Sequence, residues 1–419
     1  MHDIIVVGGG AAGMLASAAA AENGAKVLLL ERNAQLGKKL RITGKGRCNV
    51  TNDTTIDEVI ENIATGGSFL HSSLNLFKPS DTIEFFEKLG VPLKTERGNR
   101  VFPRSDSAAD VADALVRYMD STGVERRRGR GLGITTDMDG RVSCVKTTDG
   151  SHECAAVILA TGGISYPATG STGDGHNIAR ELGHTVTPLR GSLVPLEAEP
   201  DVCGRMQGLA LKNVRLTVYD GGKKPVFEGF GELLFTHFGI SGPLVLSASA
   251  HMRDFSSKNY VAYIDLKPGL DEKKLDLRIL RDFEKYSNRD FANSLGDLLS
   301  RLIIPVIVEK SGIPPGMKVH SISRESRLGL VRQIKGFKIE ISGPRPVDEA
   351  IITSGGVDLR EIHPKTMESK LISGLFFAGE IIDADAYTGG FNLQIAWSTA
   401  FAAGRAAAAF AANRAQEAG

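Results

Sequence analysis

Three glycines near the start of the chain have the spacing of a phosphate-binding turn. They are Gly8, Gly10 and Gly13, in the pattern G-x-G-x-x-G. In such a motif the first glycine permits a tight turn, the second lets a pyrophosphate approach the backbone, and the third lets a helix pack closely on a strand. Unpaired N–H groups and the positive end of the helix dipole then face the phosphates. The motif therefore indicates the binding of a dinucleotide.

The elements that would position these glycines flank them in the sequence. Ile4 to Val7 is apolar and β-branched, which is typical of a strand buried in a parallel sheet. Residues 14–22 predict an Ala-rich helix and residues 26–30 a second buried strand. Glu31 ends that strand, where a carboxylate accepts hydrogen bonds from a ribose 2′-OH and repels a 2′-phosphate. This stretch alone does not separate FAD from NAD, and a glycine turn in a ligand-free α/β protein is the alternative.

Length and composition exclude several classes of protein. The chain has 419 residues, enough for two or three domains, and its net charge is +1. That balance gives no electrostatic argument for binding nucleic acid or a membrane surface. The four cysteines lack metal-ligand spacing, so we expect no metal site, and their scarcity fits a reducing cytoplasm. We find no signal-peptide pattern and no apolar run of about 18 residues, and expect a cytoplasmic protein without membrane segments.

A basic, glycine-rich loop follows the first strand–helix–strand unit. Residues 36–52 contain three glycines and the cations Lys38, Lys39, Arg41, Lys45 and Arg47. Such a loop suits a phosphate or the anionic edge of a reduced flavin, although a solvated basic loop is the alternative. Cys48 is interpreted either as a redox thiol or as a small packing residue, because no second cysteine lies near it in the sequence.

Two later segments would complete a dinucleotide-binding fold. Residues 155–160 predict another buried strand, which ends at Thr161-Gly162-Gly163 and leads through a Gly- and Ser-rich loop to a helix at 176–182. Residues 374–380 repeat the pattern of strand and glycine near the C-terminus, and Gly389-Gly390 open a last helix. The N-terminus of that helix would stabilise the negative charge of a reduced flavin. This closing segment favours FAD over NAD.

The sequence between these segments indicates inserted domains. Short strands at 191–268 and 336–344 predict an antiparallel, barrel-like β-domain, and the charged, Leu-rich stretch 269–335 predicts a helical insert. The FAD-binding domain would then comprise residues 1–190 and 345–419. We therefore expect an α/β protein with a Rossmann-like, two-dinucleotide-binding-domain FAD fold, interrupted by the β-domain and a helical cap.

Over essentially its whole length the chain resembles the BaiN-type, or aminoacetone-oxidase-type, FAD-binding flavoproteins of bacteria. The most specific motifs are GKGRCNVTN at 44–52, LFTHFGISGP at 234–243, SGGV at 354–357 with KTM at 365–367, and FAGE at 377–380 followed by GGFNLQ at 389–394. One departure is Ala386, which stands where family members often carry glycine and is expected to alter the loop beside the flavin.

The resemblance implies a tightly bound FAD and, together with the motifs above, a set of residues around it. These residues are Gly8, Gly10, Ala11, Ala12, Gly13, Glu31, Arg32, Lys39, Gly46, Arg47, Cys48, Asn49, Gly131, Thr161, Gly162, Gly379, Glu380, Asp383, Gly390, Asn392, Leu393 and Gln394. Asp383 has a spacing able to reach the ribityl hydroxyls.

An FAD-dependent oxidoreductase acting on a small organic molecule is the leading hypothesis for function. The resemblance to bile-acid reductases implies reduction of an enone-like C=C bond, driven by NADH or NADPH, with a protein acid protonating the α-carbon. His237 and Tyr166 are the candidate acids, and each is alternatively a packing residue. No second G-x-G-x-x-G follows a strand, so nicotinamide would bind only transiently.

Two other classes of function stay open. Because the sequence has no second dinucleotide motif for a nicotinamide donor, an O₂-dependent amine oxidase is the alternative. A non-catalytic role, with FAD as a structural group or redox sensor, or a role in tRNA modification as in a related flavoprotein family, is the third possibility. The near-neutral charge argues against a nucleic-acid partner.

Overall fold

The chain divides into two compact units, each with its own hydrophobic core. The computed structural model describes residues 2–418. Unit 1 takes in residues up to Ser192 and those from Val347 onward, and unit 2 is Leu193–Pro346. Separate clusters of buried apolar side chains lie in the two units. Unit 1 is therefore discontinuous in sequence, with unit 2 inserted into it.

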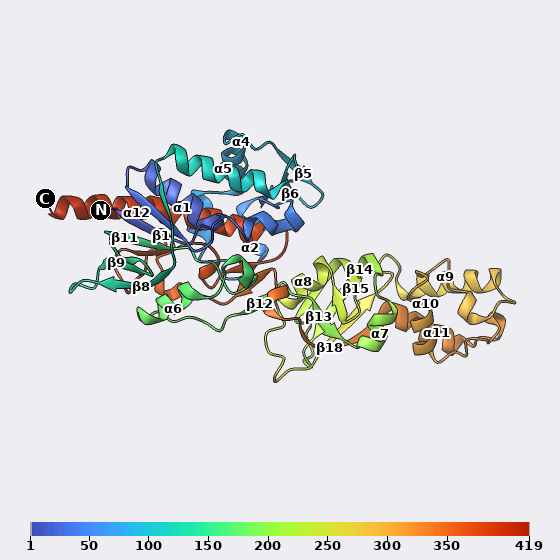
Figure 1. Cartoon of the computed structure of the whole chain (residues 1–419). Helices are drawn as coiled ribbons and strands as arrows, with labels where there is room; N and C mark the ends of the chain where they lie inside the picture. The colour runs from blue at the N-terminus through green and yellow to red at the C-terminus, as the bar shows by residue number, and fades with distance from the viewer. Residues whose placement is uncertain (1, 419) are drawn as a thin grey trace. The chain divides into compact units, whose positions relative to one another are not determined.

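A five-stranded parallel sheet forms the centre of unit 1 (Figure 1). Its spatial order is β20 (Leu375–Phe377), β11 (Ala156–Leu159), β1 (Ile4–Val7), β2 (Val27–Glu31) and β7 (Glu125–Arg128). In the register of the sheet, Ile4 lies between Val27 and Ala156. Apart from Glu31, the side chains of β1, β2 and β11 are buried, as the apolar sequence of these strands predicts. The parallel pairing brings the carboxyl ends of these three strands to the same edge.

Two helices from opposite ends of the chain, α1 (Ala11–Glu22) and α12 (Phe391–Ala418), pack against each other beside this sheet (Figure 1). Their backbones are so close that a Cβ at Gly404 would lie 2.5 Å from the carbonyl oxygen of Ala16. The single tryptophan, Trp397, is fully buried and donates its Nε1–H to the Val50 carbonyl at 2.9 Å. Small residues on both helices thus permit the close packing.

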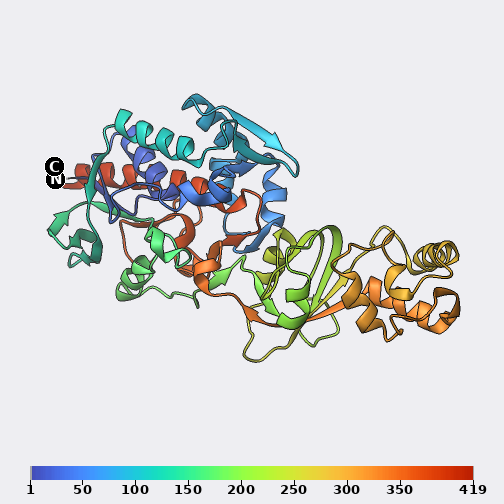
Figure 2. The same ribbon diagram turned by 45° about the vertical axis from the view of Figure 1, so that its right-hand side comes forward.

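The remaining elements of unit 1 surround the central sheet. Figure 2 shows the meander of β8 (Gly131–Thr136), β9 (Val142–Thr147) and β10 (Gly150–Glu153) on one side of the central sheet. Helix α5 (Ala108–Ser121) lies on the other side together with α1 and α12. The helices are α2 (Ile56–Glu61), α3 (His71–Leu76), α4 (Pro79–Lys88), α5 (Ala108–Ser121) and α6 (Asp174–Glu181). The strands are β3 (Thr51–Asn52), β4 (Ile63–Thr65), β5 (Leu93–Glu96), β6 (Arg100–Pro103), β8 (Gly131–Thr136), β9 (Val142–Thr147), β10 (Gly150–Glu153), β12 (Arg190–Ser192), β19 (Ile352–Ser354) and β21 (Asp385–Ala386).

Unit 2 is built on a closed, six-stranded antiparallel barrel. Its order is β13 (Leu196–Ala198), β16 (Gly239–Ser241), β15 (Phe227–Phe235), β14 (Ala210–Tyr219), β17 (Tyr260–Asp265) and β18 (Phe337–Pro344), with the short helices α7 (Pro200–Arg205) and α8 (Pro243–Ser249). Val214, Leu216 and Val218 alternate with exposed or half-buried neighbours and fill the interior. The parallel sheet and the inserted antiparallel barrel with its helices confirm the predicted fold class.

The insert predicted at 269–335 is helical only in part. Helices α9 (Glu272–Lys285), α10 (Ile304–Ser311) and α11 (Arg324–Lys335) form, whereas residues 286–303 are mostly turns. Phe291, Leu295 and Leu299 in this stretch are nevertheless buried. Their apolar spacing resembles that of a helix, but Gly296 and the polar run at 287–290 favour turns instead.

Two helical glycines should respond in opposite ways to replacement by alanine, because only one of them lies in the α1–α12 contact. Alanine is normally the better helix former by about 1 kcal/mol. At Gly404, however, the added methyl group would overlap a backbone oxygen, so we expect Gly404→Ala to destabilise the protein by about 1–3 kcal/mol. Gly329 in α11 has only a flexible arginine tip near its Cβ position, at 4.0 Å, so Gly329→Ala should not destabilise the protein. Urea unfolding followed by circular dichroism, with Trp397 fluorescence as a second probe for unit 1, checks both signs. Equal effects of the two substitutions would contradict the packing argument.

Candidate cofactor site

Two of the three glycines in the turn between β1 and α1 are closely packed, and the third has open space at its Cβ position. Gly8 has φ +107°, and a Cβ there would lie 2.5 Å from the Ala160 carbonyl oxygen. A Cβ at Gly13 would lie 1.7 Å from the carbonyl oxygen of Gly8. The Cβ position of Gly10 has no atom within 4 Å. The first and third glycines of the motif are therefore needed for packing, whereas the second faces open space.

The first turn of α1, which includes Ala11 and Ala12, has the properties of an anion site. Gly10 is the N-cap, and within residues 2–418 no side chain caps the helix and no acidic residue occupies its first turn. The N-terminal N–H groups and the helix dipole are thus available to an anion. This open, uncapped end next to Gly10 fits the pyrophosphate of FAD.

Glu31 at the end of β2 is held in place by three hydrogen bonds. Its Oε2 accepts from the Gly9 N–H at 2.6 Å, and its Oε1 accepts from the N–H and Nδ2 of Asn33 at 2.8 and 2.7 Å. Carboxylate oxygens can accept further hydrogen bonds, so a ribose hydroxyl can still be bound. The neighbouring Arg32 donates to Thr172 and forms an ion pair with Asp174 at the start of α6. Arg32 therefore connects the end of β2 to the loop that follows β11.

Arg47 in the basic loop is bound to two carboxylates of the protein. It pairs with Glu96 and Asp106, each at 2.6 Å, and its guanidinium lies 4.3 Å from the centre of the Phe102 ring. The hydrogen bond to Glu96, followed by that to Asp106, raises the pKa of Arg47. Its position in the site thus depends on the turn around β5 and β6.

The backbone of the same loop takes an unusual path. Gly44, Lys45 and Gly46 have successive positive φ angles, and a Cβ at Gly46 would meet no atom within 4 Å. Asn49 follows, and its buried Oδ1 has no hydrogen-bond partner within the described residues. An unpartnered buried oxygen beside an open glycine is a second feature that fits a bound polar group.

Cys48 has the environment of a packing residue. It is fully buried with φ +59°, and burial raises the pKa of its thiol to about 12, although a hydrogen bond with Thr43 lowers it in part. A thiol with so high a pKa is protonated at neutral pH and is a poor nucleophile. The packing interpretation therefore describes this cysteine better than the redox interpretation.

Lys39 and Glu380 join four distant segments of unit 1 in one polar cluster. The Lys39 ammonium donates to Glu380 at 2.7 Å and to Ser165 Oγ at 2.7 Å. The Glu380 Oε1 also accepts from the Thr353 N–H at 2.8 Å and from the Ser165 hydroxyl. Burial acts to raise the pKa of Glu380, but Lys39 and Thr353 outweigh it and the pKa is lowered. The carboxylate is thus held ionised by a lysine 341 residues away in sequence.

The returning C-terminal segment lies against the first turn of α1. A Cβ at Gly379 would be 2.7 Å from the Cβ of Ala12, and the Gly379 N–H donates to Thr399 in α12. At the start of α12, a Cβ at Gly390 would lie 2.4 Å from the backbone of Thr51. The glycine motif at the start of the chain and the predicted closing segment near its end therefore come together.

Several predicted cofactor residues make hydrogen bonds within the protein. Asn392 accepts from the Ala386 N–H and donates to the carbonyls of Ala386 and Tyr387, so it fixes the loop before α12. Ala386 itself does not have a positive φ, so nothing in its backbone requires glycine. The Asp383 N–H donates to Val357, and Leu393 is half-buried against the core.

The side-chain amide of Gln394 makes all of its hydrogen bonds within the protein. It is fully buried; its Oε1 accepts from the hydroxyls of Thr51 and Thr82, and its Nε2 donates to the Phe77 carbonyl and to Ser398. These are the four hydrogen bonds that a glutamine amide can make. Gln394 thus holds the start of α12 to the segments before it.

The segment after β11 contributes buried polar groups. The Oγ1 of Thr161 has no hydrogen-bond partner in the described part of the chain, and Gly162 has φ +73°. A Cβ at Gly131, at the start of β8, would lie 2.9 Å from Val7. Thr161 is thus, after Asn49, the second predicted residue with a buried polar atom that has no partner among the described residues.

His176, Ser165 and Thr353 were not predicted. His176 is buried in α6, its Nε2 lies 3.1 Å from the Ile381 carbonyl oxygen, and its Nδ1 has no partner among residues 2–418. Burial lowers the pKa of His176 to about 4. The Gly- and Ser-rich loop at 165–175 was the only sequence signal for this region, and it did not identify single side chains.

The two candidate acids lie in different units. Tyr166 belongs to unit 1 and has a left-handed backbone, with φ +53°, and the Lys39 ammonium lies 6.0 Å from the centre of its ring. A bulky residue in this conformation is strained, and such strain clusters at functional sites. His237 is exposed in unit 2, on the turn between β15 and β16, beside the ring of Phe238. The residues predicted to hold FAD all belong to unit 1, as Tyr166 does.

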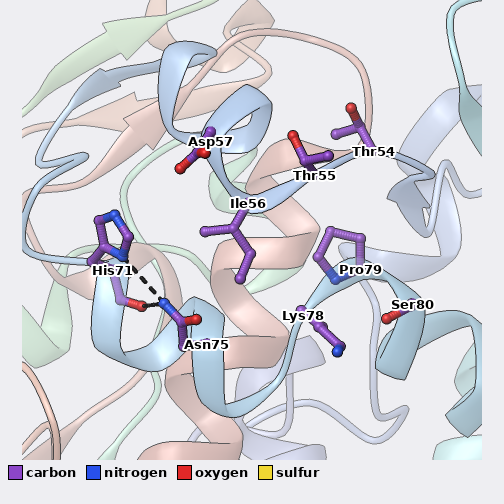
Figure 3. A pocket seen from close by; sticks show the side chains of 9 residues that line it. All are labelled: Thr54, Thr55, Ile56, Asp57, His71, Asn75, Lys78, Pro79 and Ser80. Atoms are coloured by element: carbon purple, nitrogen blue, oxygen red, sulfur yellow. Dashed lines mark hydrogen bonds between the residues drawn. The ribbon is translucent and has the colours of Figure 1, made fainter.

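A surface hollow of about 440 Å³ lies elsewhere in unit 1 (Figure 3). The helices α2, α3 and α4 and the segments before α2 and α4 form it, and Asn75 donates to the carbonyl of His71 at its side. Its lining residues are Thr54, Thr55, Ile56, Asp57, His71, Asn75, Lys78, Pro79 and Ser80. This set shares no residue with the predicted cofactor site.

Comparison with known proteins identifies the family. The sequence profile described as "HI0933-like protein Rossmann domain" matches residues 2–406. The chain belongs to the HI0933-like family. The resemblance expected from the motifs is thereby confirmed, as is the expectation of an FAD-dependent oxidoreductase. No helix in the described part of this HI0933-like protein is long and apolar enough to cross a membrane.

This HI0933-like protein is similar to two relatives over most of its length. It is 30% identical over 397 residues to the 3-dehydro-bile acid delta(4,6)-reductase of Clostridium scindens, covering 92% of this chain and 94% of the relative. It is 31% identical over 385 residues to the ribosomal RNA dihydrouridine synthase of Escherichia coli, covering 90% and 91%. Among solved structures, the 3-ketosteroid delta1-dehydrogenase of Sterolibacterium denitrificans has a TM-score of 0.53 at 14% identity, covering 97% of this chain and 99% of that one. The last similarity shows a shared fold.

Because the Cβ position of Gly10 is open, a substitution there should weaken cofactor binding without preventing folding. Gly10 has φ −81°, which valine adopts readily, and no atom within 4 Å of its Cβ position. Gly10→Val should therefore leave folding intact but obstruct the pyrophosphate, and we expect FAD affinity to fall at least about tenfold. Flavin absorbance per chain after dialysis and reconstitution measures the loss. Gly296→Val, at another open glycine, is the control. Normal FAD content in Gly10→Val would contradict the placement of the cofactor.

The buried His176 predicts a pH dependence of stability. Its pKa is about 4 in the folded protein and 6.5 when unperturbed, so the unfolded chain binds the proton more readily. The stability contributed by neutral His176 is complete above pH 6.5 and is lost as the pH falls toward 4, by up to roughly 3 kcal/mol. His176→Gln, which keeps a donor for Ile381, should flatten the free energy of unfolding between pH 6.5 and 4 in urea titrations. The exposed His71→Gln is the control, and an unchanged slope in His176→Gln would refute the prediction.

Proposed function

We propose that this HI0933-like protein uses FAD to reduce a C=C bond conjugated with a carbonyl group in a small organic molecule. The observation that carries the proposal is the chemistry shared by the names of the two relatives. A dehydro-bile acid delta(4,6)-reductase and a dihydrouridine synthase, both about 30% identical to this chain, each saturate a carbon–carbon double bond. In a 3-keto Δ4,6 steroid and in uracil that bond is conjugated with a carbonyl. The relatives thus share a reaction type although their substrates differ.

The residues of the candidate site suit the cofactor that this reaction requires. Bound FAD supplies the hydride chemistry, and the protein supplies binding, orientation and electrostatics. The open turn at Gly10 and the first turn of α1 would hold the pyrophosphate, and Glu31 the adenosine ribose. Lys39, in its ion pair with Glu380, would fix the junction of the N- and C-terminal segments. The N-terminus of α12 would face the negative charge that develops on the flavin on reduction.

Addition of hydrogen across a conjugated C=C bond requires a proton as well as a hydride. The β-carbon receives the hydride and the α-carbon the proton. Tyr166 is our choice of acid, because its strained backbone fixes it beside Lys39 in the unit that carries the predicted cofactor residues. His237 in unit 2 is the second choice. We propose NADH or NADPH as the electron donor, bound transiently because the chain has no second G-x-G-x-x-G after a strand.

A second candidate function is the reduction of uridine in ribosomal RNA. The observation that favours it is that two relatives, from Escherichia coli and Haemophilus influenzae, are named ribosomal RNA dihydrouridine synthase, at 31% and 30% identity. The net charge of +1 favours the small-molecule substrate, since proteins that bind RNA typically carry a basic surface.

Anaerobic titration of the FAD-loaded protein tests the proposal. We expect NADH or NADPH to bleach the visible absorbance of the oxidised flavin. An added 3-keto-Δ4 or Δ4,6 steroid should then restore the absorbance and appear as the saturated product by mass spectrometry. Failure of both nucleotides to bleach the flavin, with bleaching by a primary amine and recovery in O₂, would support the amine oxidase instead. Conversion of uridine in ribosomal RNA, without steroid reduction, would support the second candidate.

Two substitutions test the choice of acid. Tyr166→Phe should lower the rate of flavin reoxidation by the enone at least about 100-fold, the usual size of a general-acid contribution, while flavin reduction by NAD(P)H stays within about twofold. His237→Asn should leave both half-reactions near wild type. The opposite pattern would transfer the role to His237, and two unaffected variants would remove both residues from the mechanism.

A further inference from the structure

A hollow on the outer face of the barrel in unit 2 has a lining unlike that of the predicted cofactor site. Its volume is about 560 Å³, within the range of small-molecule sites. Apolar groups form most of the lining, and one strand and one loop contribute polar side chains. The lining residues are Asn213, Arg215, Phe230, Leu266, Lys267, Pro268, Gly269 and Leu270.

The strand register explains why these residues meet. Arg215 on β14 pairs with Phe230 on β15 on one side and with Asp265 on β17 on the other. Side chains alternate along a strand, so Arg215 points outward where Val214 and Leu216 point into the barrel. The loop that follows Asp265 then borders this strip of outward-facing side chains. The hollow is thus formed by two adjacent strands, β14 and β15, and the loop that follows β17.

Phe230 is the most exposed aromatic side chain of this strip. Its exposed fraction is 59%, although the barrel interior and the helical insert bury most other large apolar side chains of the unit. Leu266 and Leu270 add apolar area from the loop. An exposed apolar surface in a concave place commonly marks a binding site.

The charges around the hollow do not cancel. Arg215 pairs with Glu228 at 2.6 Å, and Asp265 pairs with Lys335 at 2.6 Å. Lys267 is half-buried, and within the described residues its ammonium has neither a hydrogen bond nor an ion pair. Burial, with a contribution from the charge of Arg278, lowers the pKa of Lys267. One cation in an otherwise balanced, largely apolar hollow is therefore left without a counter-charge.

We propose that this hollow binds an amphipathic organic monoanion, with its carboxylate on Lys267 and its apolar body against Phe230 and Leu270. Pairing would satisfy an ammonium that the fold leaves unpaired, and the apolar body would cover the exposed ring. Glu228 and Asp265 on the same face are each paired with a cation, so the hollow offers one free positive charge and favours a single negative charge over a polyanion such as RNA. This binding site goes beyond the proposed reduction and does not depend on it.

Calorimetric titration of the FAD-loaded protein with 2-naphthoate tests the proposal, and the neutral 2-naphthamide is the matched ligand. We expect naphthoate to bind about tenfold more tightly than naphthamide, because charge-assisted hydrogen bonds are roughly twice as strong as neutral ones. Lys267→Met keeps the apolar stem and should abolish the difference. Lys223→Met, at an exposed lysine of the same unit, should preserve it. Phe230→Ala should weaken both ligands.

Each contrary result overturns the inference. Equal binding of the two ligands would exclude a role for charge, and unaltered naphthoate binding by Lys267→Met would place the ligand elsewhere. Displacement of naphthoate from the wild-type protein by a short oligoribonucleotide would identify an RNA surface instead. Because these measurements record binding without turnover, they are independent of the outcome for enone reduction.

Discussion

The contact between β1 and α1 leaves no room for side chains, and the rest of unit 1 depends on it. A methyl group at Gly13 would overlap the Gly8 carbonyl oxygen, and one at Gly8 would overlap the end of β11. Because the helix lies so near the sheet, its first turn reaches the same edge as the ends of β1, β2 and β11. The same closeness allows Gly379 to approach Ala12 from the C-terminal side. One steric constraint therefore positions both the turn that faces the cofactor and the segment that returns to it.

Charge pairing extends this constraint to the basic loop and to the segment after β11. Glu380 is buried enough for its charge to be costly, and Lys39, Ser165 and Thr353 together compensate that cost. The four residues come from four segments, so the ion pair also fixes how those segments lie relative to each other. Removing one partner would leave an uncompensated charge, which is more damaging than the loss of the pair. Electrostatics and backbone packing thus define the same site.

The sequence predicted the packing role of the glycines and the architecture more reliably than the contacts of individual side chains. Gly8, Gly13 and the strands around them follow from local spacing and apolar runs, because the steric need of such a turn is local. The barrel followed from short alternating strands. Gln394 shows the limit: its motif indicated the cofactor, yet its amide is saturated by Thr51, Thr82, Phe77 and Ser398. No sequence signal identified the side chain of His176, because its burial arises from packing against a carbonyl 205 residues away in sequence.

The discontinuity of unit 1 has a consequence for the order in which the protein acquires its structure during synthesis. Strand β20 and helix α12, which complete the sheet and cover α1, are synthesised after all of unit 2. Unit 2 is contiguous and is finished by then, so it can fold while the buried face of α1 and one edge of the sheet are still exposed. Contacts between such distant segments form late and slowly. The nascent chain therefore passes through a long interval in which an apolar helix and a strand edge require protection from other chains, and the cofactor can be enclosed only after β20 and α12 have been made.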